Sequence, residues 1–329
     1  LQPRSAGKDT LTGHWELMGL VIDQPFPTYP EGFPDHLIAS LEFACDRGII
    51  GNCAASGTQI IEQLGPRHLQ TDELIVYTSA DSVLQIAAHE DVVPVEELYA
   101  CCLQARSICH GPHAVARIIA RPFIGEPGSF VRTDGRRDFP LPPPGPLVTE
   151  SLARVGISVG SVGKIGQIYG GRGLAEQVHA SDNSAALAQI DRLWADGRHQ
   201  VVFANLIDFD TLYGHRNNAV GYAHALQQFD RWLDEFLEHL EDDEAVMITA
   251  DHGCDPTMPG TDHTREYVPM LLYGPRIVPG IGGTVSGFAL VGAALASIMG
   301  VELDTEYRDL LATLVADETG DSADERRIG

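Results

Sequence analysis

The sequence has few basic residues and no apolar run long enough to cross a membrane. Its 22 Lys and Arg residues are outnumbered by 46 Asp and Glu, so the 329 residues carry a net charge of −24. Nucleic acids and anionic membranes bind to basic patches, and the composition argues against both as partners. A phosphorylated substrate is still compatible with it, because a few local Arg, Lys or metal ions outweigh the mean charge. No signal peptide is visible, and we expect a cytoplasmic protein.

None of the six cysteines belongs to a Cys-x-x-Cys pair. Zinc ribbons and thioredoxin-type redox motifs are therefore not supported. In a chain of this length we expect free thiols of the kind found in cytosolic proteins. Cys254 lies among candidate metal ligands, but the oxygen and nitrogen donors around it are harder ligands, and we expect those to bind a metal instead.

A proline-rich segment over residues 140–146 separates two kinds of pattern. Residues 25–143 mix strand-like and helix-like runs and predict a compact mixed domain. From residue 147 onward strands alternate with helices, which is typical of a mainly parallel α/β sheet. The acidic segment after about Ala316 has little apolar content, and we expect it to be mobile.

The individual elements follow from hydrophobic periodicity. The clearest is a long helix over 219–240, where apolar residues recur every three or four positions. The other expected helices cover 95–106, 184–194 and 288–299. The expected strands cover 74–77, 115–119, 155–162, 201–207, 245–250 and 268–273.

Two of the predicted strands end in residues that bind transition metals. The strand over 245–250 runs directly into an Asp-His pair, and a second His follows eleven residues later. The strand over 201–207 is followed by Asp and His as well. Ligands of open α/β sheets bind beyond the carboxyl ends of strands, so both clusters are expected at one edge. The candidate ligands are Asp210, His215, Asp251, His252 and His263.

Two carboxylates and three imidazoles are more than one ordinary catalytic ion requires, and they suit two ions. Mixed carboxylate and imidazole ligands favour Mn, Fe or Zn over Ca or Mg. Paired ions stabilise the attacking and leaving oxygens in phosphoryl transfer. Asp208 alternates with Asp210, so we expect one of the two to face the ions and the other to bond backbone.

The segment from Gly7 to Glu16 supplies a candidate nucleophile, Thr10. A Thr hydroxyl is weakly nucleophilic at its ordinary pKa, but metal coordination activates it. Glycine on both sides permits close approach of backbone to phosphate. A threonine in such a loop also often serves as a helix cap, and the motif alone leaves both interpretations open.

Five longer motifs closely resemble the phosphopentomutases, a family of the alkaline phosphatase-like superfamily. They cover nearly the whole chain in the expected order. The motifs are GKDTLTGHWE (7–16), TSADSVLQIAAHE (78–90), ARPFIGEPGSFVRT (120–133), NLIDFDTLYGHR (205–216) and ITADHGCDPTMPGTDHTREYVP (248–269).

The resemblance implies an isomerase that interconverts ribose 1-phosphate and ribose 5-phosphate, and their deoxyribose counterparts. It implies two Mn2+ ions, a phosphothreonine and a sugar bisphosphate intermediate that also acts as activator. Thr10 would carry the phosphoryl group. Asp210, His215 and His263 would bind one ion, and the Asp251-His252 pair would bind the other.

The resemblance also implies a metal-binding core of residues 1–24 and 144–329, with a mainly parallel sheet flanked by helices. Residues 25–143 would form an α+β cap domain inserted into it. A monomer is expected. The family's substrate contacts would correspond to Ser79, Asp81, Arg121, Arg136 and Lys164, and Arg side chains match phosphate geometry well.

Members of this family normally begin with a core strand that ends in an Asp ligand of the second ion. Only six residues precede Gly7 here. We therefore expect an N-terminally incomplete member with weak affinity at the second ion site and little mutase activity. A sheet without that inner strand would leave unpaired backbone groups. Cys254 also departs from the family, which usually has Asn at this position.

Two alternatives accompany the mutase interpretation. One is a metal-dependent phosphatase or a phosphoglycerate mutase-like enzyme built on the same core, against which the TSADS and ARPFIGEPG segments argue. The other is a non-catalytic binding remnant, supported by the absent Asp alone.

Overall fold

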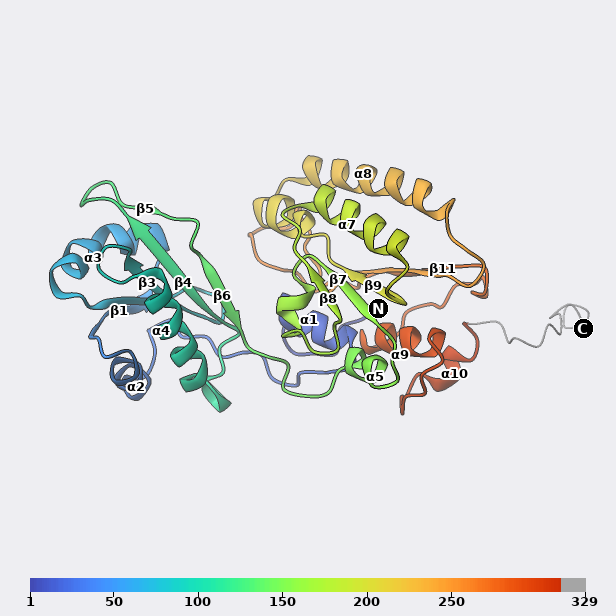
Figure 1. The fold of residues 1–329 in the computed structure, drawn as a ribbon, viewed down its shortest axis with the longest axis horizontal. Coiled ribbons are helices and arrows are strands. Elements are labelled where there is room, and N and C mark those ends of the chain that lie inside the picture. Colours follow the sequence, from blue (N-terminus) through green and yellow to red (C-terminus); the bar gives the residue numbers. More distant parts are fainter. Residues whose placement is uncertain (315–329) are drawn as a thin grey trace, which may run out of the picture. The chain divides into compact units, whose positions relative to one another are not determined.

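The computed structural model of the protein describes residues 1–314, so the segment expected to be mobile after Ala316 lies outside the described residues. The chain forms two compact units, drawn in Figure 1. Unit 1 comprises Leu1–Gln24 and Pro143–Gly329, and unit 2 comprises Pro25–Pro142. Within the described range, none of the helices combines the length and apolar character that a membrane span requires.

Unit 2 is built on a six-stranded mixed sheet with the order β1-β2-β3-β4-β5, in which β6 also pairs with β4. The pairs β1–β2 and β3–β4 are parallel, and the other pairs are antiparallel. The strand predicted over 115–119 extends further than expected, since β4 continues through the apolar Pro122-Phe123-Ile124. The strands are β1 (Ile49–Ala54), β2 (Leu74–Thr78), β3 (Val83–His89), β4 (Arg117–Ile124), β5 (Val131–Arg132) and β6 (Arg137–Pro140).

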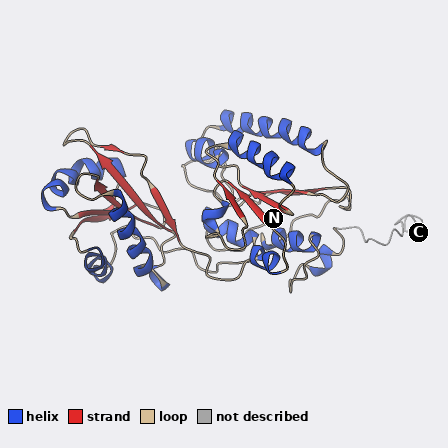
Figure 2. Ribbon diagram, viewed as in Figure 1, coloured by secondary structure: helices blue, strands red, loops and turns tan. Residues whose placement is uncertain are grey.

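Both faces of this sheet are covered by helices, as Figure 2 shows. Side chains alternate along β2, so Leu74 and Val76 pack against α2 (Asp35–Cys45) and α4 (Val95–Ile108). Ile75 and Tyr77 face the opposite side and pack against α3 (Gly57–Thr71). This second face, beneath the start of α3, carries several of the polar residues considered below.

The strands of unit 1 form two separate groups rather than the single sheet that the sequence predicted. Strands β7 (Val159–Val162), β8 (Glu176–Val178) and β9 (Val201–Ala204) form a parallel sheet with the order β8-β7-β9. Strands β10 (Val246–Thr249) and β11 (Met270–Tyr273) form a separate antiparallel pair. Among residues 1–314, β9 and β10 share no backbone pairing.

All four predicted strands of unit 1 are shorter in the structure than in the sequence analysis. The run over 155–162 begins as a strand only at Val159, because Val155 ends a preceding helix and Gly156 follows with a φ of 87°. The run over 201–207 ends at Ala204, and the next side chain, Asn205, accepts a bond from the backbone N of Lys164. The run over 245–250 is a strand only over Val246–Thr249, and the run over 268–273 begins as a strand at Met270.

The predicted helices of unit 1 are present with small changes at their ends, and helices cover both sides of its strands (Figure 1). Helix α8 spans Ala219–Leu237, and its apolar side chains line a cavity of about 480 Å³ that reaches β9, β10 and the polar residues Thr10 and Asp251. The other helices are α1 (Thr10–Leu17), α5 (Val148–Arg154), α6 (Ile165–Ile168), α7 (Asn183–Asp196), α9 (Ala289–Ile298) and α10 (Arg308–Leu311).

A buried carboxylate holds the first residues of the chain against α1 and α9. Glu16 is fully buried and accepts hydrogen bonds from the backbone N of Arg4, Ser5 and Phe288, at 3.0, 2.7 and 2.8 Å. Each donor would lack its partner without this carboxylate, and a buried unsatisfied donor costs about 1–3 kcal/mol. The side chain therefore stabilises the segment that leads into Thr10.

We expect Glu16→Ala to lower the free energy of unfolding by about 3–5 kcal/mol, since three backbone donors lose their acceptor at once. Glu16→Gln keeps one acceptor oxygen and should lose less. Urea unfolding followed by circular dichroism measures the difference, with the exposed Glu238→Ala as control. A loss below 1 kcal/mol for Glu16→Ala would show that the three bonds are replaced by water.

Candidate active site

Thr10 begins helix α1 but does not cap it. The cap is Asp9, whose side chain accepts from the backbone N of Thr12 at 3.0 Å and from its hydroxyl at 2.6 Å. The interpretation of Thr10 as a helix cap is therefore wrong, and the Asp9 carboxylate takes that role. The Thr10 hydroxyl lies 3.3 Å from Nε2 of His252.

Two basic side chains join the segment before α1 to the loop that carries His263. Lys8 donates to the Asp262 carboxylate at 2.6 Å and to the backbone O of His263 at 2.7 Å. Arg265 donates to three backbone carbonyls, those of Ser5, Ala6 and Gly7. The contacts fix His263 close to Thr10, although more than 250 positions separate the two residues in the sequence.

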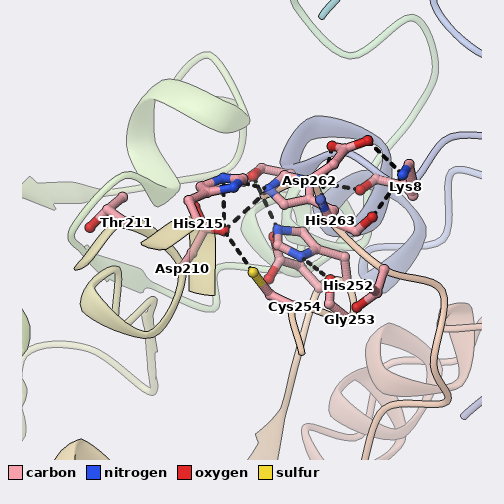
Figure 3. Close-up of polar contacts among 12 residues, drawn as sticks. Lys8, Asp210, Thr211, His215, His252, Gly253, Cys254, Asp262 and His263 are labelled. Atoms are coloured by element: carbon pink, nitrogen blue, oxygen red, sulfur yellow. Dashed lines mark hydrogen bonds and ion pairs between the residues drawn. The ribbon is translucent and has the colours of Figure 1, made fainter. Parts of the chain in front are cut away.

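Asp210, His215 and His263 converge on one point, shown in Figure 3. Their candidate ligand atoms all lie within 4.8 Å of one another. Nε2 of each imidazole is 3.2 Å from Oδ1 of Asp210, and the two Nε2 atoms are 3.1 Å apart. Asp210 comes from the single π-helical turn Phe209–Tyr213, and such turns are frequent at functional sites.

The opposite nitrogen of each of these imidazoles is anchored to backbone. Nδ1 of His215 donates to the carbonyl of Thr261 at 2.6 Å, and Nδ1 of His263 donates to that of Lys8 at 2.8 Å. With Nδ1 held by a backbone carbonyl, Nε2 of each ring is directed at the common point, as in metal-binding histidines. Burial would raise the pKa of Asp210, but its bonds to both imidazoles outweigh burial and hold the pKa well below its usual range.

A second polar group lies beside the first. His252 stacks on His263 with ring centroids 3.7 Å apart, and its Nε2 is 3.3 Å from Oδ2 of Asp251. The buried His14, one turn along α1 from Thr10, places Nδ1 2.9 Å from the same Asp251 oxygen and 2.9 Å from the Thr10 carbonyl. Burial would lower the pKa of His14, but the charge of Asp251 raises it.

Helix α1 approaches the Asp251 backbone closely at Gly13. A β-carbon added to Gly13 would lie 1.8 Å from the Asp251 carbonyl oxygen. Only glycine allows this separation, and the separation sets the position of Thr10 relative to the Asp251-His252 pair.

We expect Gly13→Ala to push α1 away from Asp251, to cost about 1–3 kcal/mol of stability and to disrupt the second polar group. The measurement combines thermal unfolding with Mn2+ titration. Gly280→Ala serves as control, because a β-carbon there meets nothing within 4 Å. Unchanged Mn2+ binding in Gly13→Ala would contradict the assigned role of this contact.

Two neighbours of the site have other partners. The Asp208 carboxylate accepts from the backbone N of Asn183 at 2.9 Å, so Asp208 is the member of the Asp208/Asp210 pair that bonds backbone. The Cys254 thiol donates to Asp210 at 3.5 Å. Burial and the nearby Asp210 charge raise the pKa of Cys254 to about 12, which keeps it a thiol. All six cysteines are free, as predicted.

The remaining predicted site residues are divided between the units. Lys164 lines the cavity that also contains Thr10 and Asp210. The other four belong to unit 2, where the backbone N of Asp81 donates to Ser79 and Arg121 donates to Gln85 at 3.1 Å. Arg136 donates two parallel hydrogen bonds to the Asp138 carboxylate, at 2.9 and 3.0 Å.

Sequence reasoning missed His14, Lys8 and Arg265 as site residues. His14 has the helical i+4 spacing from Thr10, which is a usable signal once α1 is known. Lys8 and Arg265 each bond backbone carbonyls of a segment far away in the sequence, and no sequence pattern predicts such contacts.

Comparisons with known proteins agree on one family. The model of the Metalloenzyme superfamily matches residues 11–304. A phosphopentomutase of Caldanaerobacter subterraneus subsp. tengcongensis is 52% identical over 299 residues, which cover 91% of this chain and 76% of that protein. A phosphopentomutase of Acetivibrio thermocellus is 50% identical over 313 residues, which cover 95% of this chain and 81% of that protein. A third, of Herpetosiphon aurantiacus, is 49% identical over 316 residues and covers 95% and 81%.

Proposed function

The chain belongs to the phosphopentomutases, isomerases of the Metalloenzyme superfamily, and on this premise we propose that it interconverts ribose or deoxyribose 1-phosphate and 5-phosphate through a phosphorylated Thr10. The observation that supports this most directly is the position of the Thr10 hydroxyl, 3.3 Å from Nε2 of His252 and beside two groups of potential metal ligands. The hydroxyl stands at the first turn of α1, where backbone N–H groups favour a phosphate.

The donor set fits two Mn2+ ions, which we propose as the cofactors. Asp210, His215 and His263 would hold one ion, because their three ligand atoms converge and both imidazoles, anchored through Nδ1, direct Nε2 at the same point. Asp251 and His252 would hold the second, with Thr10 beside them. When bound, such ions neutralise charge on phosphoryl oxygens and lower the pKa of the hydroxyl that is attacking or leaving.

The reaction we propose has two transfers. In the first, the bond between phosphorus and the Thr10 oxygen breaks while a sugar hydroxyl forms a new bond to phosphorus. The proton of that hydroxyl passes to the Thr10 oxygen, which becomes a hydroxyl again, and the product is a sugar bisphosphate. In the second, the Thr10 hydroxyl forms a bond to the other phosphorus, the bond from that phosphorus to the sugar oxygen breaks, and the Thr10 proton passes to the sugar oxygen to give the isomeric monophosphate. Loss of the bisphosphate would leave the enzyme unphosphorylated, so a sugar bisphosphate would also act as activator.

The chain's own residues contribute orientation and proximity. His14 bonds the Thr10 carbonyl and Asp251, and so couples the position of the nucleophile to that of a ligand. Lys8 holds the His263 loop against the start of α1. We further propose that unit 2 is a cap domain. The proposed substrate contacts are Ser79, Asp81, Arg121 and Arg136 of unit 2 and Lys164 of unit 1. The free cysteines fit a reducing, cytoplasmic environment, and we expect a monomer.

A phosphatase or a phosphoglycerate mutase-like enzyme on the same core would give different products. With Mn2+, a sugar bisphosphate and ribose 1-phosphate, we expect ribose 5-phosphate to form faster than inorganic phosphate is released. ³¹P NMR follows both species in one sample. Release of phosphate without isomerisation would favour a hydrolase, and conversion of 3-phosphoglycerate would favour the mutase of that substrate.

A further inference from the structure

Three cysteines of unit 2 gather on one face of its sheet. Cys45 ends helix α2, and Cys101 and Cys102 lie in the middle of helix α4. The two helices pack against each other on this face (Figure 1), and the three side chains belong to one apolar cluster there. Thiols that are far apart in the sequence are therefore neighbours in the fold.

Two of these thiols are in direct contact across the interface between the helices. The side chains of Cys45 and Cys101 are hydrogen-bonded to each other. Cys101 is only 4% exposed, whereas Cys45 is half-buried at the end of its helix. A small solute can therefore reach the pair from the side of Cys45.

An ion pair joins the same two helices beside this contact. Arg47 follows Cys45 by two residues, and its Nε donates to Oε1 of Glu97 at 2.7 Å. Glu97 lies in the first turn of α4, one turn before Cys101. The ion pair and the apolar cluster thus both hold the end of α2 against α4, independently of the two sulfurs.

The surroundings of the pair favour one thiolate beside one thiol. The Cys45 thiol donates to the Cys101 sulfur, and this bond lowers the pKa of Cys101 although burial opposes the change. The same bond and burial raise the pKa of Cys45, so Cys45 keeps its proton. Burial raises the pKa of the neighbouring Cys102, which stays an unreactive thiol. The thiolate is the reactive form of cysteine, and here it is in contact with a second sulfur.

We propose that hydrogen peroxide converts Cys45 and Cys101 into a reversible disulfide that links α2 to α4. In the first step one sulfur forms a bond to a peroxide oxygen, the O–O bond breaks, and the hydroxide that leaves takes up the thiol proton as water. In the second step the other sulfur bonds to the resulting sulfenic acid, the S–O bond breaks, and a second water leaves with the remaining thiol proton. Two thiols are oxidised to one disulfide, and one peroxide is reduced to two waters. Neither step requires the phosphoryl transfer proposed for Thr10.

The first test treats the full, metal-free chain with hydrogen peroxide, blocks the remaining thiols by alkylation and maps the bonds by peptide mass spectrometry without reductant. We expect a linked pair of peptides that contains Cys45 and Cys101, formed from two of the six free thiols. Cys53→Ser is the matched control, because Cys53 is an exposed thiol on β1, and this variant should form the same bond. Oxidation that leaves Cys45 and Cys101 unlinked, or that links Cys45 to Cys102 instead, would overturn the proposal.

Hydrogen exchange on the full chain tests whether the bond links the two helices firmly. Backbone amides at the end of α2 exchange when that helix opens away from α4, and a disulfide at Cys45 should prevent this motion. We expect their exchange to become at least about tenfold slower after oxidation and to return to its first rate with dithiothreitol.

Two controls accompany the exchange measurement. Peptides from α3, which packs on the opposite face of the sheet, should exchange at the same rate before and after oxidation. In Cys45→Ser, peroxide should leave the exchange of α2 unchanged. Equal exchange of α2 in the reduced chain and in the fully cross-linked chain would contradict the proposed link between the helices.

Discussion

Thr10→Ala should reduce the isomerisation of ribose 1-phosphate by this chain to the rate measured without enzyme. The hydroxyl is the acceptor and donor of the phosphoryl group in the proposed reaction, and alanine offers no oxygen for either step. Removal of the hydroxyl leaves Asp210, His215 and His263 in place, so Mn2+ binding at that cluster should change little. The variant thus separates loss of the nucleophile from loss of the metal.

The controls for this variant are two other threonine changes. Thr10→Ser retains a hydroxyl and should retain measurable activity. Thr211→Ala removes a hydroxyl that donates to the Ile207 carbonyl in the neighbouring turn, and it should leave the nucleophile intact. Kinetics and metal analysis on the same preparations give the comparison. Substantial isomerisation by Thr10→Ala would rule out Thr10 as the nucleophile.

His263→Ala should reduce Mn2+ affinity by more than about 100-fold, which exceeds the loss usually caused by removing only a partner of a ligand. Three features make His263 central: Nε2 lies 3.2 Å from Asp210, Nδ1 is fixed by the Lys8 carbonyl, and the ring stacks on His252. Its loss removes a ligand of one proposed ion and the packing surface of a ligand of the other. Isomerase activity should fall as the fraction of chains with bound Mn2+ falls.

Calorimetric titration with Mn2+ measures the effect, and His239→Ala is the matched control. His239 is an exposed residue near the end of α8 and bonds the Glu235 carbonyl. Circular dichroism confirms that both variants are folded. Tight Mn2+ binding by His263→Ala, equal to that of the control, would show that the Asp210 cluster does not hold the ion.

The sequence predicted the candidate ligands because their chemistry is local. The Asp251-His252 pair directly follows a strand, and Asp210 and His215 lie in one loop. Their assembly into one site follows from the rule that strand ends share an edge. Convergence of Asp210, His215 and His263 could be anticipated in this way, but not the orientation of the two rings, which depends on the carbonyls of Thr261 and Lys8.

The long amphipathic helix was easier to predict than the ends of the strands, for a physical reason. Helix α8 has an apolar stripe over its whole length, so periodicity alone determines it. Short apolar runs contain no such repeat, and Val155 was included in a strand although it ends α5. Helix α1 was not predicted, because its residues from Thr10 to Leu17 are buried on almost every side and show no amphipathic pattern.

Buried polar contacts were the least predictable part. A charged residue in a helix normally indicates a solvated face. Glu16 is instead buried and accepts from three backbone donors, one of them at Phe288. The contact between Gly13 and the Asp251 carbonyl joins segments far apart in the sequence. Both features depend on the packing of distant backbone, which composition and periodicity do not encode.

The most direct test of the central claim is the phosphorylation state of Thr10. The full chain is incubated with Mn2+ and ribose 1,5-bisphosphate, and intact and peptide mass spectrometry are then recorded. The account predicts one phosphoryl group per chain, located on Thr10, which disappears when ribose 5-phosphate is added in excess. No phosphorylation, or phosphorylation at another residue with Thr10 unmodified, would contradict it.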